Sequence, residues 1–438
     1  MFRKRLANML NHRHELYRLA GLIEWEAFEK EFGGLYSENG RPGIPIRMMV
    51  GLTYLGHAFG ISDEEVVRRW VENPYWQFFC GEEYFRHELP IDPSSLSRWR
   101  KRVGAQGSEL ILKITLSAGL QSGAVRPSSL ERITVDTTVQ PKAIAFPTDS
   151  RLYNRSRARL VKLAAKNGID LRQSYSRLGA QALLKAGRYL HARQGKRARR
   201  EIKRLKTFLG RVYRDIQRKI TDRDGLKPVF QPELSLAARL LSQGKKDKNK
   251  LYSLHAPEVE CIAKGKAHKK YEFGVKVSIA ATNRDNFVVG MFAEHGNPYD
   301  GHTLCRALEQ VERITGKAIE RGFVDRGYRG HGMAGPAIFI SGRRRGMTPQ
   351  LKKELKRRNA IEPVIGHMKA DGKLGRNHLL GVLGDKINAL LCGAGHNIRL
   401  ILRKLRELLL FLVLVKWCQE LWHSAPWHPE DDFAAAVG

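Results

Sequence analysis

Three acidic residues stand in settings that suit a metal-binding carboxylate. Asp136 lies within the β-branched run 133–139, whose strict alternation places it on the polar face of an expected strand. Asp325 closes a short apolar stretch and is expected where a strand gives way to a loop. Glu362 opens an expected helix, and Lys369, almost two turns later, shares its face. Mg²⁺ takes oxygen ligands of this kind, and two such ions can activate one oxygen and neutralise another in phosphodiester chemistry.

Each of these residues also has a plainer explanation. A strand aspartate can simply face solvent on a half-exposed sheet. Asn359 followed three residues later by Glu362 is a capping box, and the helix dipole favours an acidic residue in the first turn. The combination is more informative than its parts because a divalent cation needs several carboxylates at one place.

The charge of the chain indicates a polyanionic partner. The 438 residues include 77 Lys and Arg against 44 Asp and Glu, which gives a formal net charge of +33. Such a field favours nucleic acid and makes its binding salt-dependent. Between residues 151 and 250 we count 29 basic and 7 acidic residues, a net of +22. Apolar residues recur there at helical steps from Ile202 to Ile220, which predicts an amphipathic basic helix. Its DNA-holding candidates are Arg199, Arg200, Lys203 and Arg204.

Other features exclude several classes of protein. The longest apolar run, Leu408 to Val415, is far shorter than the ~18 residues that a membrane span needs. The N-terminus starts basic but lacks the apolar core of a signal peptide. Five scattered cysteines show neither zinc-ligand spacing nor a disulfide framework. We therefore expect a cytoplasmic protein without a membrane partner.

The first 125 residues are expected to form an all-α DNA-binding domain. Helices are predicted over 46–58 and 63–72 around a turn at Gly60, an arrangement similar to a helix-turn-helix. A further helix from about residue 94 is the candidate for DNA contact, through Arg98, Arg100 and Lys101. A helical bundle whose basic face is merely solvated is the alternative.

The rest of the chain predicts an α/β domain. Strands are expected over 272–282 and 287–295 as an antiparallel hairpin, a helix over 301–315, and another strand over 337–340. Together with the strands that carry the two aspartates, this is the element order of an RNase H-like mixed sheet with a basic helical insertion. Such a fold would bring Asp136 beside Asp325. The predicted organisation is a catalytic domain over 126–400, containing the insertion 151–250, and a helical tail over 401–438.

At this point the chain resembles the DDE transposases of bacterial insertion sequences, most closely the IS-five group. Blocks at 135–138, 296–302, 324–330 and 361–369 are similar to that group's recurring blocks and occur in the same order. The stretch 43–103 looks like its helical DNA-binding domain. The group's last block follows the pattern Tyr-x2-Arg-x3-Glu-x6-Lys. Arg358, Glu362 and Lys369 match it, whereas Leu355 occupies the tyrosine position.

The resemblance implies a transposase that binds the terminal inverted repeats of its element, cleaves there and joins the ends to target DNA. Asp136, Asp325 and Glu362 would hold Mg²⁺ or Mn²⁺, as two ions, while Arg358 and Lys369 would bind phosphates. It also implies a homodimer or higher synaptic complex associated with the bacterial nucleoid. The alternative is a catalytically inactive, transposase-derived DNA-binding regulator, against which the intact carboxylate trio argues.

Overall fold

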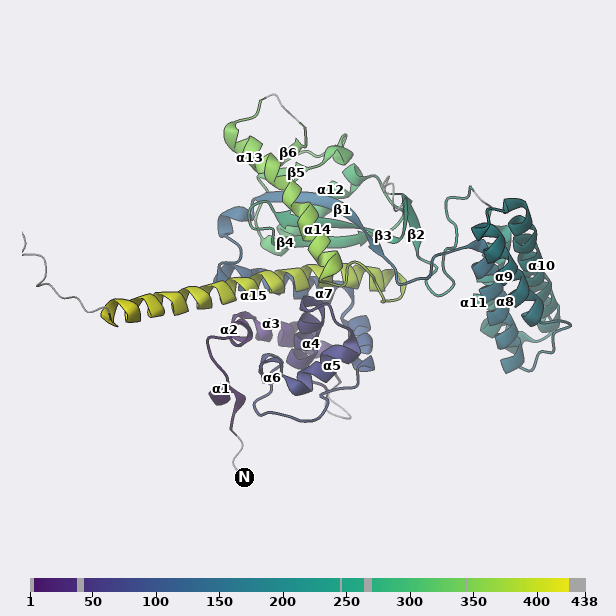
Figure 1. Cartoon of the computed structure of the whole chain (residues 1–438), viewed down its shortest axis with the longest axis horizontal. Helices are drawn as coiled ribbons and strands as arrows, with labels where there is room; N and C mark the ends of the chain where they lie inside the picture. The colour runs from purple at the N-terminus through teal and green to yellow at the C-terminus, as the bar shows by residue number, and fades with distance from the viewer. Residues whose placement is uncertain (1–3, 38–42, 245, 264–269, 343–345, 425–438) are drawn as a thin grey trace, which may run out of the picture.

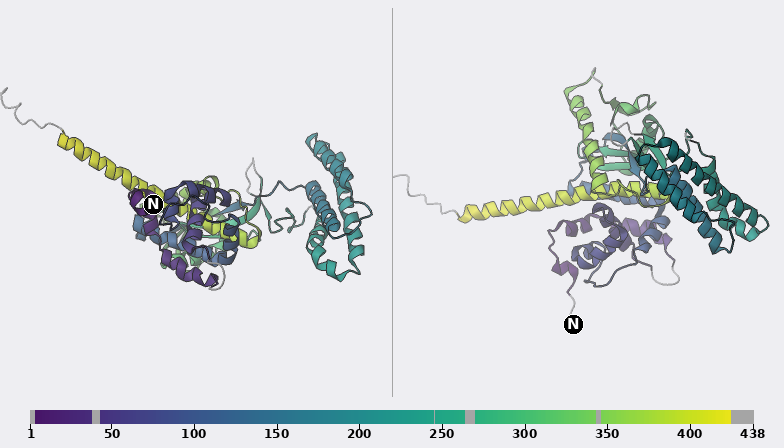
Figure 2. Two further views of the ribbon diagram at one scale, coloured as in Figure 1. Left: turned by 90° about the horizontal axis from the view of Figure 1, so that it is seen from below. Right: turned by 45° about the vertical axis from the view of Figure 1, so that its right-hand side comes forward.

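The computed structural model describes residues 4–37, 43–244, 246–263, 270–342 and 346–424, with side chains as far as residue 410. It has three parts, which Figure 1 shows side by side. A group of N-terminal helices lies on one side of the long helix α15, a mixed sheet lies on the other side, and a separate helical bundle stands apart from both (Figures 1 and 2).

The N-terminal part is built from short helices whose ends follow from local sequence. The helices predicted over 46–58 and 63–72 are confirmed as α4 and α5, and the Ser62 side chain caps α5 by accepting from the Glu65 amide. Gly60 between them has φ +65°, and a Cβ there would lie 2.6 Å from the Asp371 carbonyl oxygen, so only glycine fits. The helices are α1 (Leu6–Met9), α2 (Glu15–Leu22), α3 (Trp25–Phe32), α4 (Ile46–Ala58), α5 (Asp63–Glu72), α6 (Pro74–Phe79) and α7 (Ser94–Ser122).

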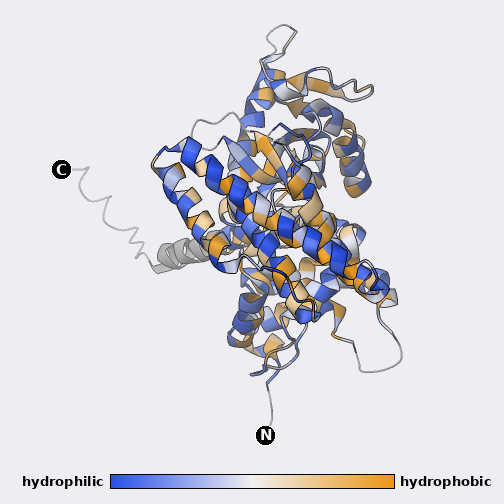
Figure 3. Ribbon diagram, turned by 90° about the vertical axis from the view of Figure 1, so that its right-hand side faces the viewer, coloured by the Kyte–Doolittle hydropathy of each residue, from blue (hydrophilic) through white to orange (hydrophobic). Residues whose placement is uncertain are grey.

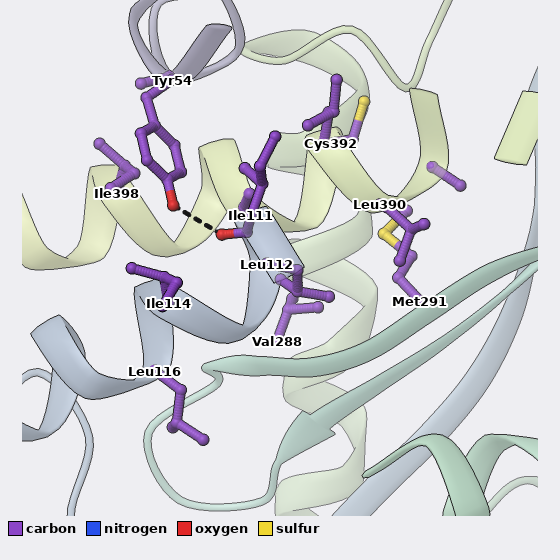
Figure 4. Packing of buried hydrophobic residues seen from close by; sticks show 14 of the residues in the cluster. Tyr54, Ile111, Leu112, Ile114, Leu116, Val288, Met291, Leu390, Cys392 and Ile398 are labelled. Atoms are coloured by element: carbon purple, nitrogen blue, oxygen red, sulfur yellow. Dashed lines mark hydrogen bonds between the residues drawn. The ribbon is translucent and has the colours of Figure 1, made fainter. Parts of the chain in front are cut away.

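Helix α7 joins this part to the rest of the molecule. It is longer than predicted and kinks at Gly104, whose φ of 66° and ψ of −163° are not helical. Beyond the kink it packs against α15, and Tyr54 of α4 donates to the Ile111 carbonyl at 2.7 Å (Figure 4). Leu112 and Met291 lie in the same cluster, so the N-terminal helices and the sheet share one hydrophobic core.

Helix α15 (Gly381–Ser424) runs without a break across residue 400, where the sequence analysis placed a domain boundary. The residues 401–410 therefore continue the last helix of the sheet domain instead of starting a separate element. Ile401 and Leu405 are buried in the main core, because α15 lies between the sheet and the N-terminal helices. Residues 425–438 of the predicted tail lie outside the described residues. Within the described ranges, no helix is long and apolar enough to cross a membrane.

The sheet is mixed, and β1 is its central strand. β1 pairs antiparallel with β3 and parallel with β5, β6 adds parallel to β5, and β2 and β4 both pair with the side of β3 away from β1. The predicted hairpin is confirmed as β3 and β4, and the predicted strand 337–340 as β6; β2 was not predicted. The strands are β1 (Arg132–Pro141), β2 (Glu260–Ala263), β3 (Tyr271–Thr282), β4 (Val288–Glu294), β5 (Arg321–Val324) and β6 (Ala337–Ile340).

Three helices and two 3₁₀ turns surround the strand ends. Helix α12 (Asp300–Thr315) connects β4 to β5 and packs on the sheet. The turn η4 (Arg326–Tyr328) follows β5. Helix α13 (Pro349–Arg357), the turn η5 (Arg358–Ala360) and helix α14 (Ile361–Ala370) follow one another almost without interruption, and α14 contacts β1 (Figure 1).

The insertion is a bundle with its own core. Helices α8 (Asp149–Lys166), α9 (Ser176–His191), α10 (Gly195–Ile220) and α11 (Lys227–Ser242) bury a cluster that is separate from the main core. The predicted amphipathic basic helix is confirmed as α10: Leu205, Leu209 and Ile216 are buried, and hydrophilic residues line much of the bundle in Figure 3. Because its core is separate, the bundle carries its charge without taking part in the packing of the sheet.

Candidate active site

Strand pairing brings Asp136 and Asp325 together. In the parallel register of β1 and β5, Thr134 pairs with Phe323. Asp136 stands two residues further along β1, and Asp325 stands two residues after Phe323, directly after the end of β5. The Asp325 carboxylate caps η4 by accepting from the Gly327 amide at 2.8 Å. The Asp136 carboxylate accepts from the Thr137 amide at 2.7 Å. The two carboxylates are thus neighbours at the same edge of the sheet, as the sequence analysis predicted.

The segment from η5 into α14 brings a cation and a third carboxylate to this edge. Arg358 is buried, and its guanidinium lies 3.6 Å from a carboxylate oxygen of Asp136 and 3.7 Å from one of Glu362. The Glu362 side chain itself is 69% exposed. Arg358 therefore bridges the two carboxylates and partly neutralises both.

Glu362 lies in the first turn of α14, which confirms the predicted helix entrance, and Pro363 fits there because the first turn needs no amide donor. The capping box considered from the sequence does not form. The N-cap residue is Ala360, which makes no side-chain cap, and the Asn359 side chain instead accepts from Arg358 at 3.1 Å. A capping role therefore does not explain Glu362.

The electrostatics at Asp136 are unfavourable without an added cation. Burial raises the pKa of Asp136 to about 6, and the charges of Asp325 and Asp300 raise it further, whereas Arg358 and the Thr137 amide act in the opposite direction. The Arg358 guanidinium therefore does not offset the effects of burial and of the neighbouring carboxylates on Asp136. Such a site favours a further positive charge.

Asp300 is the residue that the sequence analysis missed. It is the first residue of α12, and one of its oxygens accepts from the Thr137 hydroxyl at 3.0 Å and from the Lys276 ammonium at 2.8 Å. Asp300 lies in the block 296–302, but no pattern in the sequence gives it a role. The available signal is an acidic residue at the start of a predicted helix, which also fits ordinary stabilisation by the helix dipole.

The carboxylates are close but do not form a complete cage. Within the described ranges, no three His, Cys, Asp or Glu side chains meet in a geometry that could hold a metal ion. Glu362 is the outlying member because its side chain points largely to solvent. Lys369, which shares the helix of Glu362, lies 3.9 Å from the Glu272 carboxylate.

The DNA-contact candidates on α7 divide into two kinds. Arg98 and Lys101 are exposed, and Arg98 lies beside a hollow of about 900 Å³ that Ser95 and Arg102 also line. Arg100 differs from the expectation: its side chain is only 7% exposed and pairs with Asp63 of α5. That ion pair fixes α7 to α5, so Arg100 supports the helix instead of being displayed to a ligand.

A second cleft connects the N-terminal helices with α14. Its volume is about 810 Å³, and it lies between the start of α7 and the loop that follows α14. Lys369, Lys373 and Arg376 line it together with Ser94 and Ser97, and the acidic residues Asp63 and Glu64 line it as well. Basic and hydroxyl side chains of this kind suit phosphate oxygens.

The basic candidates of the insertion lie on the surface of α10. Arg199, Arg200 and Lys203 are exposed. Arg204 is also exposed and pairs with Glu201 at 2.9 Å. The structure does not bring these four residues near the carboxylates, because the bundle stands apart from the sheet (Figures 1 and 2).

Comparisons with known proteins relate the N-terminal helices to transposases. Residues 4–102 match the model of a transposase domain, DUF772. That match ends just before the Gly104 kink of α7. An uncharacterized protein, ORF8 in the nfe locus of Rhizobium meliloti, is 59% identical over 194 residues, which are 44% of this chain and 94% of that protein. No solved structure matches.

The relative is covered over nearly its whole length at high identity, and the N-terminal helices match a transposase domain. The chain therefore belongs to the same family as the Rhizobium meliloti ORF8 protein, and its N-terminal helices match a transposase domain.

Proposed function

We propose that the protein is a DDE transposase whose sheet is an RNase H-like catalytic domain. It would bind the terminal inverted repeats of its insertion sequence, cleave the DNA there and transfer the freed ends to target DNA. The observation that carries the proposal is that Asp136 lies on β1 and Asp325 directly follows the adjacent parallel strand β5. Arg358 and Glu362, from one helical segment, lie beside them. A central strand flanked by one antiparallel and one parallel neighbour supports the fold.

The residues present fit a divalent cation in charge and donor type. Asp136 and Asp325 are hard oxygen donors, and the charge of Asp325 raises the pKa of Asp136. Gly327 leaves open the space that a Cβ would fill 2.9 Å from Asp325. Bound Mg²⁺ or Mn²⁺ would activate an attacking oxygen and neutralise the leaving one. Asp136, Asp325 and Glu362 would hold it, and Arg358 would orient the first and last of these or contact a phosphate oxygen.

Three basic surfaces support DNA as the partner. The exposed cations of α7 would contact the element ends, and the cleft lined by Lys369 and Lys373 would guide the backbone from there toward α14. The α10 surface would hold flanking DNA by charge alone. Because two ends must be joined together, the reaction also requires a homodimer or a higher synaptic complex.

The test is strand cleavage and joining on DNA that carries the inverted repeats flanking the gene, with Mg²⁺ or Mn²⁺. We expect Glu362→Gln to abolish both reactions while DNA binding persists, because its exposed side chain is not needed for folding. Asp371→Asn is the matched control, since it neutralises another exposed carboxylate at the end of the same helix. Inactivity of the natural chain with specific binding intact would favour the inactive DNA-binding regulator.

A further inference from the structure

A pocket separate from the carboxylates opens where β1 begins. Its volume is about 260 Å³, and residues of β1, of the turn between β3 and β4, and of α13 line it. Among the described residues that line it, four are cationic and one, Glu354, is acidic. The cationic residues are Arg132, Arg284, Lys353 and Arg357. The excess of positive charge favours an anionic ligand.

The carboxylate of the pocket is already engaged and does not balance these cations. Glu354 accepts from Arg321 at 3.0 Å and from Gln350 at 3.2 Å. Arg132 lies 3.7 Å from the same carboxylate, which is too long for a hydrogen bond. The other three cationic side chains are exposed and form no ion pair within the described part of the chain. They are Arg284, Lys353 and Arg357.

Two of the lining residues also have buried polar atoms without a hydrogen-bond partner. Ser129 is 3% exposed, and its hydroxyl group is unpartnered among the described residues. The Nε of Arg132 is buried in the same condition. Both groups are donors, and a buried donor without an acceptor is costly. Water would offer them an acceptor but would not balance the cations, whereas a phosphate group does both.

The pocket and the candidate site lie along one face of β1. Arg132 and Asp136 are four residues apart on this strand, so their side chains leave it on the same side, roughly 13 Å from each other. The segment from α13 into η5 reaches both places, since Arg357 lines the pocket and Arg358 pairs with Asp136. A separation of roughly 13 Å corresponds to about four nucleotides along one strand of B-form DNA.

We propose that this pocket binds a backbone phosphate of the DNA, about four nucleotides from the phosphate at the carboxylates. Ser129 and Arg132 would donate hydrogen bonds to its oxygens, and the exposed cations would surround its charge. The proposal rests on the proposed function, because that function supplies the DNA. It adds a contact at the start of β1, and it makes an uncharged residue, Ser129, a determinant of DNA affinity.

The first test measures binding of the full chain to duplex DNA that carries the flanking inverted repeats, by fluorescence anisotropy. Ser129→Ala removes the hydroxyl group without changing the charge, and we expect it to weaken DNA binding by about tenfold. The melting temperature of the DNA-free protein should not fall, because this hydroxyl group has no partner in the folded chain. Ser156→Ala is the matched control. It removes another buried, unpartnered hydroxyl group, in α8 and outside the pocket, and should leave DNA affinity unchanged.

The second test does not depend on a buried position. Replacing both Lys353 and Arg357 with glutamine removes two exposed charges of α13 that line the pocket. The slope of log affinity against log salt concentration should become shallower by about 1. Replacing both Lys352 and Lys356 with glutamine is the matched control. It removes two exposed charges with the same spacing on the same helix, but neither residue lines the pocket, so the slope should not change.

The outcomes separate this proposal from the proposed function. A natural chain that binds no DNA would overturn both. If the natural chain binds DNA and the Ser129 and Lys353–Arg357 variants bind it equally well, only the pocket's role is refuted. An equal loss of slope in the two double variants would also refute it, because the effect would then be one of general charge. If inorganic phosphate raises the melting temperature of the natural chain but not of Ser129→Ala, and DNA binding is equal, the pocket binds a free anion instead of DNA.

Discussion

Replacing Asp136 with asparagine should make the metal-free protein more stable above pH 6, although it would remove a residue of the proposed site. The folded chain holds the pKa of this carboxyl group at about 6, chiefly through burial, against an ordinary value of 3.8. At about 1.4 kcal/mol per pH unit, the difference corresponds to about 3 kcal/mol of unfolding free energy. Asparagine keeps the acceptor for the Thr137 amide but carries no charge.

The sign of the effect depends on pH. Below about pH 3 the carboxyl group is protonated in the folded and unfolded chains, so the substitution should change stability little. As the pH rises from 3.8 to about 6, the unfolded chain releases its proton first, and the natural chain loses stability. Above pH 6 the full difference applies, and the variant should be the more stable protein.

Urea unfolding followed by tryptophan fluorescence, from pH 4 to pH 8 in a chelator, measures this difference. Trp70, Trp76 and Trp99 lie in the same core as β1, so they report on the right unit. Glu362→Gln is the control: its side chain is 69% exposed, and we expect a change within about 0.5 kcal/mol. A gain that is absent above pH 6, or is equal at all pH values, would refute the reasoning from burial. Added Mn²⁺ should stabilise the natural chain and not Asp136→Asn.

Three further outcomes are expected. Lys142→Met should lower the free energy of unfolding by about 3–5 kcal/mol, because the ammonium lies 2.8 Å from both Glu258 and Asp385 and its loss leaves their charges uncompensated. Urea denaturation should show that adding Asp385→Asn restores part of this stability. Gly274→Ala should disrupt the pairing of β1 with β3, since a Cβ would lie 2.0 Å from the Gln140 carbonyl; loss of soluble folded protein on gel filtration measures this. Replacing the four α10 cations with alanine should flatten the salt dependence of DNA binding, and an unchanged slope would remove that role from the insertion; those cations are Arg199, Arg200, Lys203 and Arg204.

Local signals explain which elements the sequence predicts well. The bounds of α4 and α5 follow from Ser62 and Gly60, and the β3–β4 hairpin follows from alternation around a polar turn. Features set by distant contacts were not predictable. The inward position of Arg100 depends on Asp63, which lies on another helix. The length of α7 was missed because Gly104 interrupts the helical pattern, yet the chain resumes a helix that packs on α15.

The residues of the candidate site also fall into two groups, those that local sequence predicts and those that distant contacts place. Asp136, Asp325 and Glu362 could be proposed from local sequence, because Asp136 lies on the polar face of an alternating strand and the other two lie at recognisable element ends. The bridging position of Arg358 depends on packing across β1, and the position of Asp300 depends on Thr137 and Lys276 from other strands. Such contacts join residues more than a hundred positions apart, so no local pattern reveals them.

The N-terminal helices share one hydrophobic core with the sheet, whereas the bundle has a core of its own. This arrangement determines how the proposed DNA binding could be linked to the proposed chemistry. Arg399 of α15 donates to the carbonyls of His57 and Ala58, both at 3.1 Å, and thereby satisfies the C-terminal end of α4. Gly60 contacts the backbone after α14 on the same side. The N-terminal helices and the carboxylates therefore belong to one packed body, so DNA bound at α7, as proposed, would lie at a fixed distance from the proposed site. The bundle of α8–α11 has a separate core, and its orientation can change without repacking either.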